Sequence, residues 1–148
     1  MNAMLAFFQS QIGKPVENSV SPMGNWLNGT LVAASENEMV LSFTVRNDMT
    51  NPAGTLHGGA ASAIIDEAMG MAVFALNKEF IYVTVSLAID FLDNAREGET
   101  IVAKAQIVRN GRTLVNIGCE VTNEAGKLLA KGSSNMVVTQ MKNPMFTD

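Results

Sequence analysis

The chain has 148 residues, of which 47% are hydrophobic and 16% are charged, a composition typical of one compact globular domain. Its net charge of −4, without any basic block, argues against nucleic acid as a partner. A single cysteine and a single histidine exclude an intramolecular disulfide and the usual zinc ligand sets, so we expect no metal and no other cofactor.

The first segment of the chain, residues 1–14, lacks the charged start, long apolar run and cleavage site of a secretion signal. It is expected to form a short amphipathic helix. Residues 58–76 approach the length of a membrane span but carry Asp66 and Glu67, so we expect no membrane segment. These features favour a cytoplasmic protein with one domain over 1–148 and a core over about 28–140. The low charge content also favours burial by self-association.

Hydrophobic periodicity predicts one long helix among several strands. A polar turn separates the first two strands, and Asn110-Gly111 is a strong hairpin turn between two later ones. The connections are too short for parallel crossovers. This order predicts an α+β domain in which a curved antiparallel sheet wraps around one nearly apolar central helix. The expected strands are 31–34, 39–46, 83–91, 101–108, 114–121 and 128–139, and the expected helix is 58–76.

The middle of this helix carries two adjacent acids, Asp66 and Glu67, whose side chains should point about 100° apart. A buried carboxylate requires water, a partner chain or a polar pocket. A solvent-facing ridge would also accommodate both acids, but the surrounding alanines, isoleucines and methionines favour a crevice at the edge of the helix. Gly59 and Ser62 lie on the same face of the predicted helix as Asp66, and we assign them to substrate binding.

The amino end of the helix is a second candidate site. Gly58 and Gly59 bring bare backbone N–H groups to a helix end, where they could hydrogen-bond a carbonyl oxygen that gains negative charge. The alternative is that the glycines only permit a tight turn. His57 could position a substrate oxygen or serve as a hydrogen-bonded structural residue. Asp66 lies about 12 Å along the axis from Gly58, so a substrate must bridge the gap or Asp66 belongs to a paired site.

The string NPAGTLHGGAASAIIDEA contains a spaced set of residues that resembles the hotdog-fold acyl-CoA thioesterases, and most of all their phenylacetate-degradation (PaaI-like) type. The set comprises Asn51, Gly54, His57, Gly58, Gly59 and Asp66. The resemblance extends over roughly residues 28–140. It implies the hotdog fold and a homodimer whose two sheets join edge to edge, with the active site between the subunits. A homotetramer built as a dimer of dimers is equally compatible.

The resemblance also implies roles for individual residues. Asp66 would act as a general base on water or as a nucleophile, on a thioester carbonyl held by the Gly58 N–H of the partner chain. Asn51 and His57 would fix the thioester or the water. The resemblance does not distinguish between the general-base and covalent mechanisms.

Three further residues are weaker candidates. Thr84 matches a position where the family places a Ser or Thr that orients water, although the alternation of strand 83–91 puts it on the face opposite Val83. Arg109 and Arg112 lie beside the predicted hairpin turn and could supply positive charge for the phosphates of CoA.

The expected function is therefore hydrolysis of an acyl-CoA to free CoA and a carboxylic acid. One alternative is a hydratase or dehydratase of the same fold, but such enzymes usually carry a His followed by Pro and Gly, which this chain lacks. Another is a non-catalytic acyl-CoA binding protein, a class in which the helix acid is missing. The identity of the acyl group stays open, because two subunits would shape its pocket.

Overall fold

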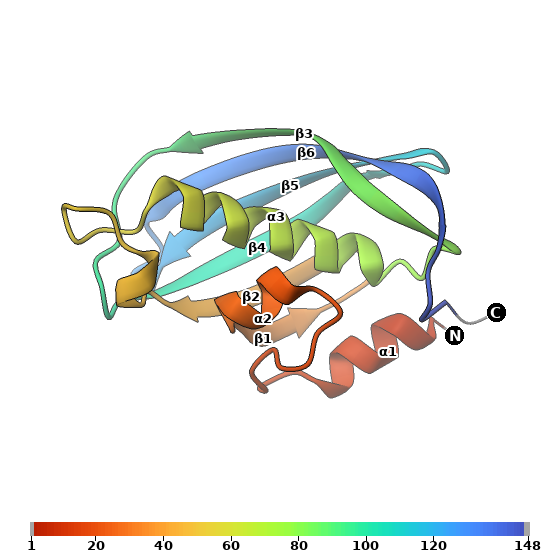
Figure 1. Ribbon diagram of the computed structural model, residues 1–148, viewed down its shortest axis with the longest axis horizontal. Helices are drawn as coiled ribbons and strands as arrows, with labels where there is room; N and C mark the ends of the chain where they lie inside the picture. The colour runs from red at the N-terminus through yellow and green to blue at the C-terminus, as the bar shows by residue number, and fades with distance from the viewer. Residues whose placement is uncertain (1, 147–148) are drawn as a thin grey trace.

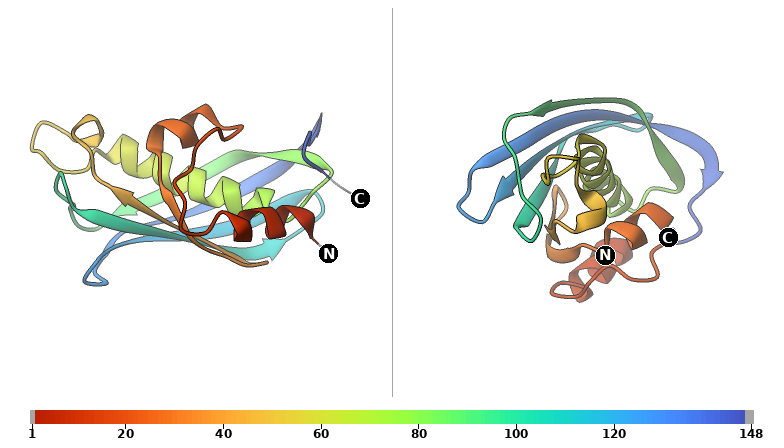
Figure 2. Two further views of the ribbon diagram at one scale, coloured as in Figure 1. Left: turned by 90° about the horizontal axis from the view of Figure 1, so that it is seen from below. Right: turned by 60° about the vertical axis from the view of Figure 1, so that its left-hand side comes forward.

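The computed structural model of the chain describes residues 2–146, which form a curved antiparallel sheet around one long helix (Figure 1). The helix runs along the concave face and is enclosed by the strands on the side away from the short helices (Figure 2). This arrangement confirms the predicted α+β hotdog fold. The elements are α1 (Ala3–Ser10), α2 (Pro22–Leu27), β1 (Thr30–Ala34), β2 (Glu38–Thr44), the 3-10 helix η1 (Asn47–Met49), α3 (Gly58–Phe74), β3 (Phe80–Phe91), β4 (Thr100–Asn110), β5 (Leu114–Asn123) and β6 (Leu128–Lys142).

Helix α3 is held in place by its apolar side chains. Ile64, Ile65 and Met69 have no measurable exposure and pack into the core formed with the concave face of the sheet. The helix ends two residues earlier than expected, at Phe74, and Asn77 then adopts a left-handed conformation that turns the chain towards β3. The sequence therefore places its two acids in the middle of a helix whose other faces are largely buried.

The order of the strands in the sheet is β1-β2-β4-β5-β6-β3. Strand β3 therefore pairs with β6, the last strand, and not with β4, which follows it in the chain. The connection through residues 92–99 crosses one end of the sheet to reach β4 (Figure 1). The strands that pair are antiparallel, as predicted. The prediction does not reveal that β3 and β4 are apart in the sheet, because alternation carries no information about which strands are neighbours.

The two edges of the sheet differ. The outer edge of β1 is covered by the segment after α1, where the Gly13 N–H donates to the Leu31 carbonyl at 2.8 Å and the Val16 N–H donates to the Gly29 carbonyl at 2.7 Å. Within residues 2–146, no strand pairs with the outer edge of β3. Strand β3 is thus a long and unprotected edge.

The short helix α2 is absent from the predicted elements. Ser21 accepts a hydrogen bond from the Gly24 N–H as N-cap, and Pro22 occupies the first turn. Both residues are recognisable start signals, but six residues are too few for apolar periodicity to be visible. None of the described helices is long and apolar enough to cross a membrane. Among residues 2–146, no group of three His, Cys, Asp or Glu side chains is placed to hold a metal ion.

Candidate active site

Asp66 finds its polar partner on the edge strand. The Thr84 hydroxyl on β3 donates a hydrogen bond to Asp66 Oδ1 at 2.8 Å. Asp66 is half-buried in the middle of α3, whereas Thr84 is exposed. The carboxylate therefore lies at the boundary between the helix and the open edge of the sheet, where it can contact both solvent and a bound molecule.

A β-bulge places Thr84 on the face that meets the helix. The register of β3 against β6 shifts between Thr84 and Ser86, so that Thr84 lies opposite Met136 and Leu87 lies opposite Ser134. Met136 and Ser134 are both buried, and Met136 belongs to the same core as the apolar residues of α3. Directly opposed residues share a face of the sheet. Thr84 lies on the face opposite Val83, as expected, but the alternation expected for 83–91 does not continue past Thr84, because the bulge inserts one residue and restarts the pattern, so that Leu87 shares the face of Thr84.

The turn before α3 is shaped by His57. The Nδ1 of its side chain accepts a hydrogen bond from the Gly59 N–H at 2.8 Å, so that His57 caps the helix. The backbone N–H of His57 donates to the Met49 carbonyl at 2.8 Å. Gly58 is the first residue of the helix and has no intrahelical acceptor for its N–H. Of the two glycines, Gly58 is therefore the one whose N–H can be offered to a ligand.

Asn51 and Ser62 are both engaged with backbone groups. The Asn51 side chain closes the loop before the helix, because its Oδ1 accepts from the Ala53 N–H at 3.0 Å and from the Thr55 N–H at 3.1 Å. The Ser62 hydroxyl donates to the Gly58 carbonyl at 2.7 Å. In the single chain these two residues stabilise the loop and the first helical turn, and their direct contact with substrate stays a prediction.

The predicted site residues lie at three separate places, namely the amino end of α3, the middle of α3 and the β4–β5 turn, whose elements are labelled in Figure 1. His57 and Gly58 lie at its amino end, and Asp66 lies about 12 Å further along the axis. Arg109 and Arg112 flank the β4–β5 turn at the opposite end, where the Lys78 ammonium donates to the Gly111 carbonyl at 3.4 Å. One chain therefore unites Asp66 with Thr84, but it does not bring Asp66 to the glycine turn or to the arginines.

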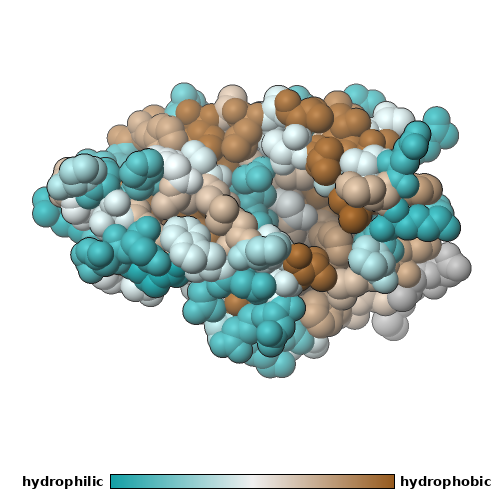
Figure 3. Space-filling model, viewed as in Figure 1, coloured by the Kyte–Doolittle hydropathy of each residue, from teal (hydrophilic) through white to brown (hydrophobic). Residues whose placement is uncertain are grey.

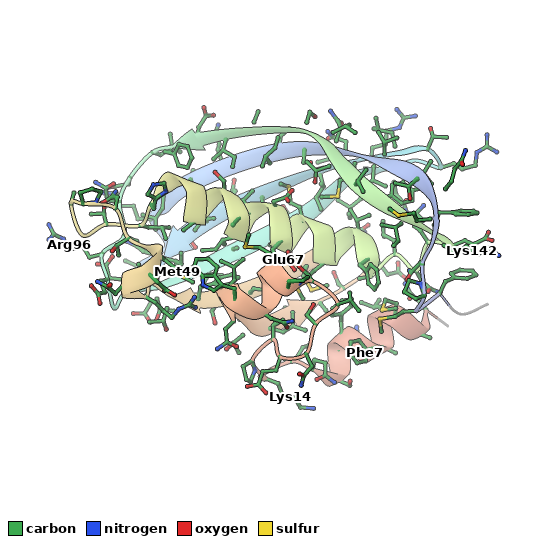
Figure 4. The ribbon with its side chains drawn as sticks, in the orientation of Figure 1. Phe7, Lys14, Met49, Glu67, Arg96 and Lys142 are labelled. Carbon is green, nitrogen blue, oxygen red and sulfur yellow. The ribbon has the colours of Figure 1, made fainter. Side chains whose placement is uncertain are left out.

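Glu67, the second acid, points away from this site (Figure 4). Its Oε2 accepts a hydrogen bond from the Ser21 hydroxyl at 3.0 Å, and a Cβ on Gly24 would collide with its Oε1. Burial raises the pKa of Glu67, an effect that the Ser21 hydrogen bond partly opposes and the nearby Asp66 charge reinforces. The Ser21 partner, 46 positions away, could not be found from sequence spacing. Glu67 fastens α2 to the central helix.

Comparison with known proteins identifies the family. A model of the thioesterase superfamily matches residues 53–130, which include the glycine turn, Asp66 and Thr84. The chain belongs to this superfamily. It is similar to human acyl-coenzyme A thioesterase 13, with 35% identity over 104 residues that cover 70% of this chain and 74% of the relative.

Solved structures of other proteins have the same fold. A hypothetical thioesterase from Streptococcus pneumoniae, solved with coenzyme A, has a TM-score of 0.73 and 25% identity, and covers 78% of this chain and 89% of its own. The Escherichia coli PaaI protein of the phenylacetic acid degradation operon has a TM-score of 0.77 and 23% identity, and covers 83% and 88%. The predicted resemblance to hotdog-fold thioesterases is confirmed.

Proposed function

We propose that this member of the thioesterase superfamily hydrolyses acyl-CoA thioesters, with Asp66 as its central catalytic group. The observation that carries this proposal is the hydrogen bond from Thr84 to Asp66, which holds a carboxylate at the open edge of the sheet. The named activity of human acyl-coenzyme A thioesterase 13 and the coenzyme A in the Streptococcus pneumoniae structure support the substrate class.

The complete site forms in a homodimer joined through β3. This strand is 12 residues long, and Val83 and Val85 on it are 42% and 60% exposed. An exposed apolar edge strand is suited to pairing with a second copy. Antiparallel pairing of two β3 strands sets the Phe91 end of one chain beside the Phe80 end of the other.

This pairing would bring the glycine turn of the partner chain towards Asp66. A Cβ on Gly58 would lie 3.5 Å from the Phe91 ring, so the glycine turn accompanies the Phe91 end of β3. The partner's glycine turn would therefore approach the part of α3 that carries Asp66. Arg109 and Arg112 lie near the Phe80 end of β3, which the partner's glycine turn would approach, and would be available there to the phosphates of CoA. Association of two such dimers into a tetramer is compatible with this arrangement.

The chemistry follows from these positions. The Gly58 N–H hydrogen-bonds the thioester oxygen and stabilises its negative charge as the carbonyl carbon becomes tetrahedral. Asn51 and His57 position the thioester or the water. Asp66 takes a proton from the attacking water, and the C–S bond then breaks, leaving its electron pair on the CoA thiolate. In the covalent variant, the Asp66 carboxylate attacks first and water hydrolyses the resulting anhydride. The scheme requires no metal or other cofactor.

The test is to mix two inactive variants and assay thiol release from acyl-CoA. Asp66→Asn removes the acid, and Gly58→Pro removes the N–H donor while proline suits the first helical position. A refolded equal mixture should recover about a quarter of wild-type activity, because half of the dimers contain one intact site. Gly58→Ala, which keeps the N–H, is the matched control. Absence of recovery would contradict the shared site, and a wild-type protein that releases no thiol would contradict the activity itself.

A further inference from the structure

A cavity of about 280 Å³ lies between α1, the segment 14–21 and the side of α3 that carries Glu67. The face of the molecule in Figure 3 is hollowed between these elements, with hydrophobic residues around the recess. Its walls are mainly apolar and include Phe7, Phe8, Leu31, Met71 and Phe74. This volume is close to the lower end of the range of about 300–1,000 Å³ found for ligand pockets, so it suits a small apolar group.

The charged residues that line the cavity include Glu67, Lys14 and Glu17. The Glu67 carboxyl is directed towards α2, where it accepts from Ser21 and abuts Gly24. Lys14 and Glu17 also border the cavity, but both are exposed at its mouth (Figure 4 labels Lys14 and Phe7). An occupant would therefore meet mainly aromatic and aliphatic side chains, with the half-buried Glu67 in one wall and the exposed Lys14 and Glu17 near solvent.

Gly70 borders this cavity on α3, one helical turn from Asp66. It lines both the large cavity and a smaller one of about 30 Å³ that lies between α3 and the start of β3. Gly70 is four residues after Asp66, so the two lie one turn apart on the same side of the helix. A Cβ at Gly70 would meet no atom within 4 Å. Packing does not require glycine here, although glycine weakens a helix interior relative to alanine.

We propose that the cavity receives the acyl group of the thioester, a medium-length apolar chain that passes from Asp66 over Gly70 and ends against α1. This inference rests on the proposed thioesterase function and names the class of acyl group that the same site accepts. Gly70 is then the specificity-determining position, because any side chain there would project into the path of the chain.

The experiment compares acetyl-CoA, hexanoyl-CoA and decanoyl-CoA as substrates of the wild type, Gly70→Ala and Gly70→Leu. In Gly70→Leu, kcat/KM for decanoyl-CoA should fall at least about tenfold relative to acetyl-CoA, and in Gly70→Ala the fall should be smaller. The melting temperature should not decrease in either variant. Ala6→Leu, which adds the same side chain to an exposed position of α1, should leave the chain-length preference unchanged.

Binding of decanoate, measured by calorimetry, provides a readout that does not depend on turnover. Decanoate should bind the wild type and should bind Gly70→Leu at least about tenfold more weakly. Equal binding to both proteins, or equal losses for acetyl-CoA and decanoyl-CoA, would overturn the assignment of the cavity. A wild type that binds decanoate but cleaves no acyl-CoA would instead overturn the proposed function and retain the pocket.

Discussion

Asp66 and Glu67 are neighbours in the sequence and carry the same chemical group, yet the fold gives them different surroundings. Asp66 faces the free edge strand and is held there by the Thr84 hydroxyl. Glu67 is turned towards α2 and held by Ser21, and its burial raises its pKa. A rotation of about 100° between consecutive residues of a helix is sufficient to separate a reactive face from a packing face.

The largest expected difference between the two acids is in turnover. Asp66→Asn should lower kcat for acyl-CoA hydrolysis at least about 100-fold, because the amide can neither accept the proton of water nor act as a carboxylate nucleophile. Glu67→Gln should retain at least about a tenth of wild-type kcat. Thiol release and circular dichroism of both variants measure activity and folding. Comparable losses of kcat in the two variants would contradict the assignment of Asp66 to a reactive face of the helix and Glu67 to a packing face.

Removal of the hydroxyl beside Asp66 should have a smaller effect. Thr84→Val keeps the shape of the side chain but loses the hydrogen bond, so the carboxylate is less well oriented and kcat should fall about tenfold. Thr84→Ser, which keeps the hydroxyl, should restore most of the activity. If Thr84→Val and Thr84→Ser have the same kcat in steady-state kinetics, the hydroxyl has no part in orienting Asp66.

On the packing face, Gly24 and Glu67 should be energetically coupled. Gly24→Ala places a methyl group against Glu67 Oε1 and disturbs its hydrogen bond with Ser21. We expect this change to lower the free energy of unfolding by about 1 kcal/mol in the wild type and to have little effect in a Glu67→Ala background. Urea unfolding of the four proteins in the cycle measures the coupling, and additive effects would show that the two residues do not interact.

The smallest expected effect is the pH dependence of stability. The pKa of Glu67 in the folded protein lies above its ordinary value of 4.5, so ionisation opposes folding. The stability contributed by the protonated form of Glu67 is therefore lost as pH rises from about 4.5 through the pKa of Glu67 in the folded protein. Glu67→Gln does not titrate, so its stability relative to the wild type should increase between pH 4 and pH 8. Urea unfolding at each pH measures this trend, and a constant difference would contradict it.

Sequence patterns predicted the structure wherever a single periodicity extended over a whole element. The helix from Gly58 and the hairpin at Asn110-Gly111 are confirmed because local residues specify them. The faces of the residues after Thr84 were predicted wrongly, because a one-residue bulge reverses the alternation of β3 midway. The contact of Ser21 with Glu67 joins distant segments through a short helix, and no local pattern encodes such a contact.

The difference between the two edges of the sheet limits how far copies of this chain could polymerise through their backbones. At the β1 edge, residues 13–16 already occupy the hydrogen-bonding positions, and Pro15 lacks an N–H to donate. Among the strands of residues 2–146, β3 is therefore the edge that is left to pair with another strand, and it can do so once. In the dimer proposed above both β3 edges are paired, so growth by strand addition would stop at two chains and the exposed edge would not become the start of a fibre.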